Sequence, residues 1–206
     1  MLKIWGRTNS LNVQKVKWVV GELGLEHERI DAGGAHGIVD SEAYGALNPN
    51  RRVPTLEEGS FVLWESNAVV RYLAEKHGAG GLWPGAPEHR ALADQWMDWQ
   101  QTTLVPDMMT VFLGLVRTEP EKRDQAAIDA AVLRLESVWA LLGDHLADRA
   151  YVAGERFSMG DIPVGAMYHR YHALGVAKQP TVSLLAWYER LTQRPAYERH
   201  VMLPLS

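Results

Sequence analysis

Two serines stand where helices are expected to begin, a position that suits the recognition of a negatively charged group. Ser10 precedes a segment with helical periodicity, and Ser66, directly after Glu65, opens a second one. The first N–H groups of a helix have no partner within it, so a hydroxyl beside them can help to bind an anion. Taken alone, each serine is more simply explained as a helix cap, and Glu65 as a surface charge.

The sequence gives little support for a catalytic thiol or a metal site within the protein. The sequence contains no cysteine, which excludes disulfides, thiolate metal sites and a cysteine nucleophile. His169 and His172 are near neighbours, but no third ligand lies close to them in the sequence. We therefore expect no bound metal.

The composition is that of an ordinary globular protein. Of the 206 residues, 47% are hydrophobic and 22% are charged, with a formal net charge of -4. No long run of one charge is present, which argues against nucleic acid or an anionic membrane as the main partner. No apolar stretch approaches the roughly 20 residues that a membrane span needs, and strand-like sequence follows Met1 directly, so we expect a cytoplasmic protein.

A first domain, residues 1–77, is predicted to be α+β. Short apolar runs indicate strands, and apolar residues spaced three and four apart indicate helices. The expected strands are residues 2–5, 27–31, 54–57 and 61–64, with a turn at Glu58-Gly59 in the last hairpin, and the expected helices are residues 13–23 and 66–77. Their order is βαβ followed by ββα, which fits one compact domain.

A linker and a helical domain are predicted for the rest of the chain. Residues 78–87 contain four glycines and two prolines, which cannot continue a helix cheaply. Residues 88–206 show helical periodicity without strand signals, so we expect an all-α domain. Its expected helices are one from Leu92 that ends or bends at Pro106, and others over residues 128–146, 159–174 and 182–193.

Four features, in this order, resemble the soluble glutathione transferases, and especially the bacterial theta-like branch that uses a serine. They are Ser10 to Lys15, Asn48 to Leu56, Glu65-Ser66, and Ser158 to Asp161, and the segment Trp99 to Leu104 is also theta-like. The resemblance spans nearly the whole chain. It implies a thioredoxin-like N-terminal domain that binds glutathione as co-substrate, and an all-α domain that contributes a pocket for a small apolar electrophile.

The resemblance gives Ser10 the task of activating the thiol of glutathione. A free thiol has a pKa near 8.5, and a hydroxyl that donates to the sulfur stabilises the thiolate relative to the thiol. Asn12 is the rival donor, because some bacterial relatives use an asparagine two positions further on, and Thr8 is a weaker candidate. This loop has no tyrosine, which excludes the tyrosine-using branches.

The remaining contacts to glutathione follow from two motifs. Val53, before a cis Pro54, would pair through its backbone with the cysteinyl part, although the local sequence alone favours an ordinary trans bond. Glu65 and Ser66 would hold the ammonium and the carboxylate of the γ-glutamyl end. Arg52 would face the glycyl carboxylate.

Two arginines compete for the glycyl end of glutathione. Arg51 stands where the family commonly has glycine, so a positive φ there would strain an arginine, and either Arg51 or Arg52 could reach the ligand. His36 is a further candidate. The loop around it departs from the theta pattern, which favours a solvent-exposed histidine.

Two groups in the helical domain have structural alternatives. Met108, Met109 and Phe112 lie where the family has its second-substrate pocket, but core packing explains them equally well. Ser158 and Asp161 match a helix-capping box, and we expect them to stabilise the domain instead of catalysing a reaction.

The resemblance also implies a homodimer that acts in detoxification. Trp96 and Trp99 share one stripe of a helix, and Asp94 falls where theta-like relatives place an acid that reaches the partner's glutathione ammonium. Intramolecular tryptophans and a solvated aspartate are the simpler explanation. Two other functions remain open: a glutathione-dependent disulfide or peroxide reductase, and a non-catalytic protein that binds hydrophobic ligands.

Overall fold

A four-stranded mixed sheet forms the N-terminal part of the computed structural model, which describes residues 1–206. The strands are β1 (Leu2–Trp5), β2 (His27–Ile30), β3 (Thr55–Glu58) and β4 (Phe61–Trp64), in the spatial order β2-β1-β3-β4. β1 pairs in parallel with β2 and antiparallel with β3, which pairs antiparallel with β4. A parallel pair needs a crossover, and α1 (Leu11–Glu22) supplies it.

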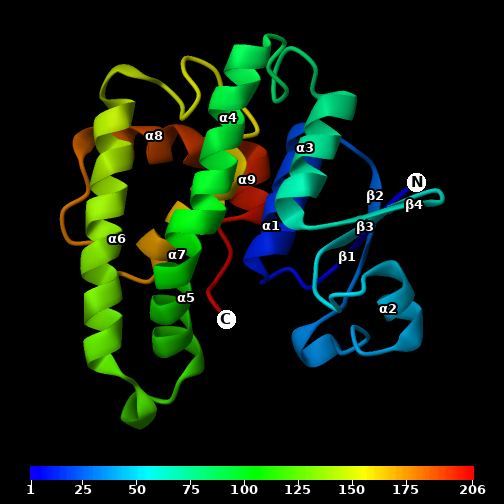
Figure 1. Ribbon diagram of the computed structural model, residues 1–206, viewed down its shortest axis with the longest axis horizontal. Helices are drawn as coiled ribbons and strands as arrows, with labels where there is room; N and C mark the ends of the chain where they lie inside the picture. The colour runs from blue at the N-terminus through cyan, green and yellow to red at the C-terminus, as the bar shows by residue number, and fades with distance from the viewer.

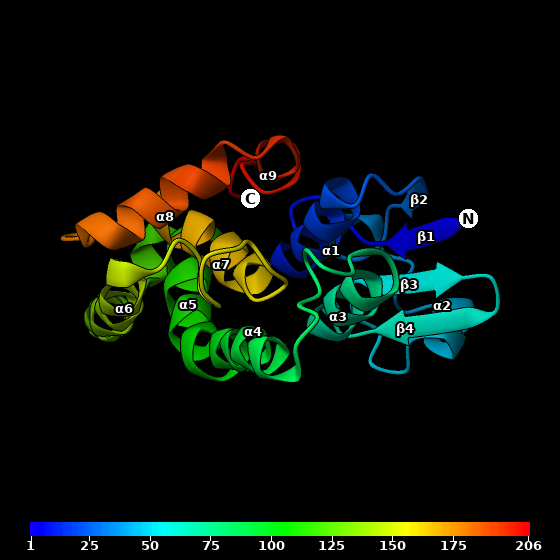
Figure 2. The same ribbon diagram turned by 90° about the horizontal axis from the view of Figure 1, so that it is seen from above.

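Two helices cover the face of the sheet that looks toward the helical part. Figure 2 shows α1 and α3 (Ser66–His77) between the sheet and the other helices. The expected βαβ-ββα order is confirmed, with two additions: the short segments η1 (Gly34–His36) and α2 (Glu42–Leu47). The expected hairpin turn is wrong by one residue, because Glu58 still pairs with Phe61 in the ladder.

The helical part begins with one long, interrupted helix. A π-helical segment separates α4 from α5, and Pro106, which has no N–H to donate to the preceding turn, is the second residue of α5. The elements are α4 (Pro87–Trp99), η2 (Gln100–Leu104), α5 (Val105–Phe112), η3 (Leu113–Arg117), η4 (Pro120–Lys122), α6 (Gln125–His145), η5 (Leu146–Asp148), α7 (Asp161–Ala173), α8 (Val182–Thr192) and α9 (Pro195–His200). Figure 1 shows α6 beside α4 and α5, and α7 packs against α4. None of the helices combines the length and apolar character that crossing a bilayer requires.

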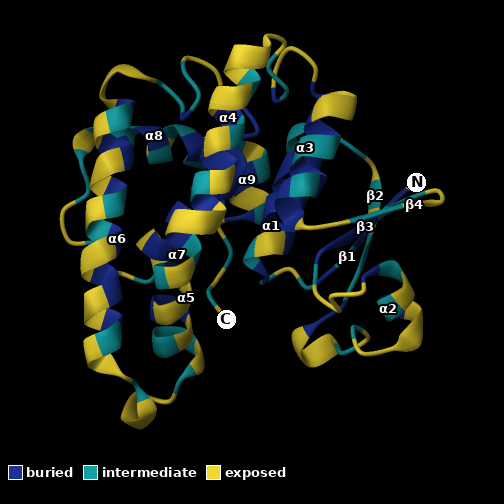
Figure 3. Cartoon of the chain, in the orientation of Figure 1, coloured by how far each residue is buried: buried dark blue, intermediate teal, exposed yellow.

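One continuous core joins the two parts. Trp18 of α1 is fully buried, and its ring centroid lies 4.5 Å from that of Tyr197 on α9 and 5.5 Å from that of Phe157. Gly165 of α7 permits this approach, because a Cβ there would lie 3.1 Å from Trp18 ring carbons. Figure 3 shows the buried residues on the inward surfaces of α1, α6 and α7. The loop before α1 is therefore held in a fixed position relative to the helical part.

Candidate active site

Ser10 directly precedes α1 and is 9% exposed. Its backbone is extended, with φ -81° and ψ 123°, and its carbonyl oxygen accepts the Gln14 N–H at 2.9 Å. The hydroxyl makes no capping bond to the helix. Ser10 therefore occupies the N-cap position, but its side chain does not cap the helix, and the hydroxyl is free to donate to a ligand.

A side-chain hydrogen bond joins the starts of α1 and α3. The Ser66 hydroxyl, on a residue 4% exposed, donates to Asn12 Oδ1 at 3.2 Å. Asn12 itself is exposed, and its amide nitrogen remains available as a donor. Ser10, Asn12 and Ser66 thus meet at two neighbouring helix N-termini, although 54 residues separate Asn12 from Ser66.

Glu65 precedes α3 in an unusual backbone conformation. Its φ is 70°, a region that favours glycine, and the side chain is exposed and forms no ion pair within the chain. Such strain costs on the order of 1–3 kcal/mol and is concentrated at functional sites. The free carboxylate beside a helix N-terminus suits a ligand that carries an ammonium next to a carboxylate.

Two buried side chains hydrogen-bond the backbone of the turn before β3. The Val53–Pro54 peptide bond is cis, as the resemblance implies. The Tyr44 hydroxyl and the Asn48 amide donate to the Arg52 carbonyl oxygen at 2.7 Å and 2.8 Å. This support leaves the polar backbone groups of Val53 at the turn for a ligand.

The two arginines differ in what they contact. Arg51 has a φ of 52°, and its Nη1 donates to the carbonyl oxygens of Ser41 at 2.9 Å and Val39 at 3.2 Å. Arg52 is exposed, and its guanidinium has no partner within the chain. Arg51 therefore stabilises the loop before α2. Of the two arginines, only Arg52 has a guanidinium that is available to a ligand.

His36 is placed on η1 with an acidic neighbour. Its side chain is 47% exposed, and Nε2 lies 3.6 Å from Asp31 Oδ1. A carboxylate at this distance competes with any anionic ligand for a protonated imidazole. His36 is exposed, as the loop pattern favours.

Sequence reasoning did not identify Lys15 as a buried charge of this site. Lys15 is fully buried on α1, and its Nζ donates to Gln100 Oε1 at 2.9 Å and to Asn67 Oδ1 at 3.3 Å. Burial lowers the pKa of Lys15 to about 7, with Glu65 acting in the opposite direction. The Lys15 side chain thereby links α1, α3 and η2.

The predicted second-substrate residues separate into two groups. Met108 and Phe112 are buried at 2% and 7% exposure, whereas Met109 is 47% exposed. Met108 therefore belongs to the core, as the structural alternative holds. Met109 presents an apolar surface on α5.

The histidines of α7 pack against tyrosine instead of forming a ligand set. His169 Nδ1 hydrogen-bonds the Tyr188 hydroxyl at 2.7 Å, and the His172 ring centroid lies 5.0 Å from that of Tyr188. Burial lowers the pKa of His169 to about 4.

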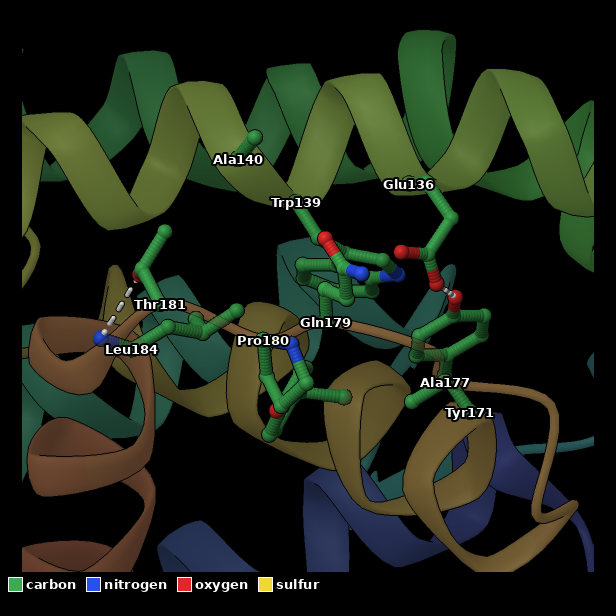
Figure 4. Close-up of a pocket in the computed structure, with 10 residues that line it drawn as sticks. Glu136, Trp139, Ala140, Tyr171, Ala177, Gln179, Pro180, Thr181 and Leu184 are labelled. Carbon is green, nitrogen blue, oxygen red and sulfur yellow. Dashed lines mark hydrogen bonds between the residues drawn. The ribbon is translucent and has the colours of Figure 1, made fainter.

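Two hollows of the structure lie away from the Ser10 site. A cavity of about 10 Å³ between α6, α7 and the segment before α8 has room for about one water molecule (Figure 4). An open groove of about 450 Å³ is lined by residues 80, 81, 84 and 85, by His89 and by residues 153–158. Neither includes a residue of the Ser10 site.

Comparison with known proteins decides the family. Residues 9–76 match the family model "Glutathione S-transferase, N-terminal domain", and residues 125–190 match "Glutathione S-transferase, C-terminal domain". Glutathione S-transferase GstB of Escherichia coli strain K12 is 43% identical over 208 aligned residues, which cover 100% of both chains. This chain belongs to the glutathione S-transferase family.

The transferase also resembles a solved structure of the theta class. That crystal structure, of the glutathione S-transferase from the citrus canker pathogen Xanthomonas axonopodis pv. citri with glutathione bound, is 45% identical with a TM-score of 0.95. The match covers 100% of this chain and 99% of that one. Glutathione S-transferase 4 of Zea mays is 30% identical over 95% of this chain and 89% of its own. The protein is a glutathione transferase with glutathione as co-substrate, and the expected thioredoxin-like and helical parts are confirmed.

Proposed function

We propose that the Ser10 hydroxyl donates a hydrogen bond to the sulfur of bound glutathione, and that the resulting thiolate attacks a small electrophile with an apolar body. The observation that carries this proposal is the buried Ser10 hydroxyl, which makes no capping bond although it stands at a helix N-terminus. Both the hydroxyl and the positive end of the helix favour the thiolate over the thiol. Asn12 is the second donor of the proposal, with its amide nitrogen free.

The direct test is the titration of bound glutathione. The thiolate absorbs in the ultraviolet where the thiol does not, so the absorbance of the complex can be followed against pH. We expect the bound thiol to have a pKa below its free value of about 8.5. A bound thiol that titrates like free glutathione would overturn the proposal.

We propose a different role for each of the two parts of the chain. Residues 1–77 bind glutathione, residues 78–87 link, and residues 88–206 supply the electrophile pocket, with Met109 on its apolar side. Arg52 binds the glycyl carboxylate, Val53 with Pro54 the cysteinyl backbone, and His36 stays at the edge of the site. We expect the transferase to act in the cytoplasm.

Glu65→Ala and Ser66→Ala are each expected to weaken glutathione binding by roughly tenfold or more. The two residues hold the γ-glutamyl end in this proposal, and the loss of a hydrogen bond to a charged group costs about 1.5–3 kcal/mol. Calorimetry with glutathione alone measures the effect. Glu75→Ala is the matched control, since Glu75 is an exposed acid on the same helix. Affinity within twofold of the parent protein in both variants would remove these residues from the site.

We further propose a homodimer formed through the face that carries β4, α3 and α4. Phe61, Trp64 and Leu92 are large apolar residues on these elements and are 43%, 36% and 43% exposed. The tryptophans of α4 lend no support, because Trp96 is 5% exposed and Trp99 packs against it and against the core. A stable two-fold interface should bury well over about 1,000 Å².

Light scattering at micromolar protein is expected to give a mass of about twice 23.1 kDa. A mass of one chain would exclude the dimer. Asp94 lies at this face, where Arg71 donates to Asp94 at 2.5 Å and to Asp98 at 2.6 Å. If Asp94 reaches the partner's glutathione, Asp94→Asn should weaken glutathione binding while the matched control Asp98→Asn does not. Equal affinities in both variants would remove Asp94 from the site.

A further inference from the structure

Three arginines that have no aspartate or glutamate partner lie around the loop that leads to Ser10. Arg7 lies in the loop between β1 and α1, Arg117 ends η3, and Arg170 lies on α7. Arg170 Nη2 donates to the backbone oxygen of Asn9, the residue before Ser10, at 3.2 Å. None of the three forms an ion pair with an Asp or Glu side chain, although Arg117 Nη2 donates to the backbone oxygen of Ser206 at 2.5 Å. Positive charge is thus concentrated next to the proposed thiolate site.

The three guanidinium groups are close enough to disfavour one another's charge. Burial, followed by Arg7 and Arg117, lowers the pKa of Arg170 to about 10. Burial, followed by Arg117, lowers the pKa of Arg7. The arrangement is unfavourable by itself, and an anion among the three would relieve the repulsion.

Two buried polar atoms of the same region have no hydrogen-bond partner. They are Arg170 Nε and Asn9 Oδ1. The neighbouring polar atoms are engaged, since Asn9 Nδ2 donates to the Ser206 hydroxyl and Arg117 Nη2 to the Ser206 carbonyl oxygen, both at 2.5 Å. Figure 1 shows the end of the chain between α5 and the start of α1, which is where these contacts form. A ligand with an acceptor oxygen would satisfy this buried guanidinium donor.

An apolar surface adjoins the arginines. The guanidinium carbon of Arg170 lies 4.4 Å from the Phe112 ring centroid, and that of Arg117 lies 6.0 Å from it. Met109 and Leu113, on the same helical run, are 47% and 43% exposed. The region therefore offers both an apolar contact and a concentration of positive charge.

We propose that Arg7, Arg117 and Arg170 bind a carboxylate of the electrophile, so that the preferred second substrates are apolar molecules with an anionic group. This inference rests on the proposed function, because it needs the thiolate at Ser10. With an aryl chloride, the thiolate sulfur forms a bond to the ring carbon and chloride leaves with the electron pair of the broken C–Cl bond. The thiol proton has already passed to solvent. The carboxylate changes no bond, and the arginines only position the carbon that reacts.

A pair of aryl chlorides that differ in charge tests this inference. We compare 4-chloro-3,5-dinitrobenzoate with the corresponding neutral benzamide, and divide each kcat/KM by the uncatalysed rate constant with glutathione. The anion is expected to be preferred by roughly tenfold or more, as for a hydrogen bond to a charged group. The ratio of the two corrected kcat/KM values, anion over benzamide, should fall in each of the variants Arg117→Gln, Arg7→Gln and Arg170→Gln. In the parent protein, about 0.5 M salt should also lower this ratio. Arg199→Gln, an exposed arginine of α9, is the control and should keep the ratio.

The outcomes separate the inference from the function on which it rests. If neither aryl chloride is consumed faster than without enzyme, the proposed function fails. If the benzamide is conjugated and the anion is not preferred, only the arginine site fails. Glutathione carries carboxylates of its own, so calorimetric affinity for glutathione is measured in each variant. A loss of that affinity with an unchanged ratio would assign the arginines to glutathione and overturn the inference.

Discussion

Ser10→Ala is expected to lower kcat/KM at about pH 6.5 by roughly 10- to 100-fold, while the dissociation constant for glutathione changes by less than about threefold. The hydroxyl acts on the thiolate, so its loss should raise the pKa of the bound thiol. A hydrogen bond to a charged group contributes about 1.5–3 kcal/mol, which corresponds to roughly one to two pKa units. Only the thiolate attacks the electrophile, so the rate falls with the ionised fraction.

The pH dependence distinguishes this effect from general damage to the site. In the variant the thiol should ionise at higher pH, so the loss of kcat/KM should shrink as the pH rises above the new pKa. A structural defect would reduce the rate equally at all pH values. The ultraviolet titration of bound glutathione should show the same shift as the kinetic profile.

Two variants test the rival donors of the same loop. Thr8 is exposed and precedes the buried part of the loop, so Thr8→Ala should leave the titration of bound glutathione unchanged. Asn12→Ala removes the acceptor of the Ser66 hydroxyl as well as a donor, so it should weaken glutathione binding more than Ser10→Ala does. An unchanged thiol titration in Ser10→Ala, together with a shift in Asn12→Ala, would transfer the catalytic role to Asn12.

The sequence was most informative where an apolar pattern is long. The stripe from Ile128 to Leu146 locates α6, and the hairpin of β3 and β4 was placed to within one residue. The helices α2 and α9 were missed because each has only 6 residues, too few for a repeated apolar spacing. The π-helical segments were missed because their sequence pattern is that of the helices they join.

The site was predictable in its residue types and not in its contacts. Motif order could suggest Ser10, but whether its hydroxyl caps the helix depends on how the side chain is turned. Lys15 stands on the polar side of the valine stripe, and it is buried because α1 has the sheet on one side and the helical part on the other. Arg7, Arg117 and Arg170 are far apart in the sequence, so only the folded chain brings their charges together.

Asp161→Ala is expected to lower the free energy of unfolding by about 3–5 kcal/mol, the largest stability effect we predict for a single side chain. The carboxylate is fully buried at the start of α7. It accepts the N–H groups of Val152 and Ser158, both at 3.0 Å, and the Trp187 indole N–H at 2.9 Å. Alanine would leave these buried donors without a partner, and each unsatisfied donor costs about 1–3 kcal/mol.

Urea unfolding with its m-value measures this loss. Asp148→Ala is the matched control in the same part of the chain, because the Asp148 side chain is 74% exposed, and it should change stability by less than about 0.5 kcal/mol. Asp161→Asn keeps one acceptor oxygen and should lie between the two. Asp161 hydrogen-bonds no residue of the Ser10 site. The thiol of bound glutathione should therefore have the same pKa in folded Asp161→Asn protein as in the parent protein. Stability close to that of the Asp148 variant would mean that the three donors find other partners, and a shifted thiol titration would give Asp161 a part in the site.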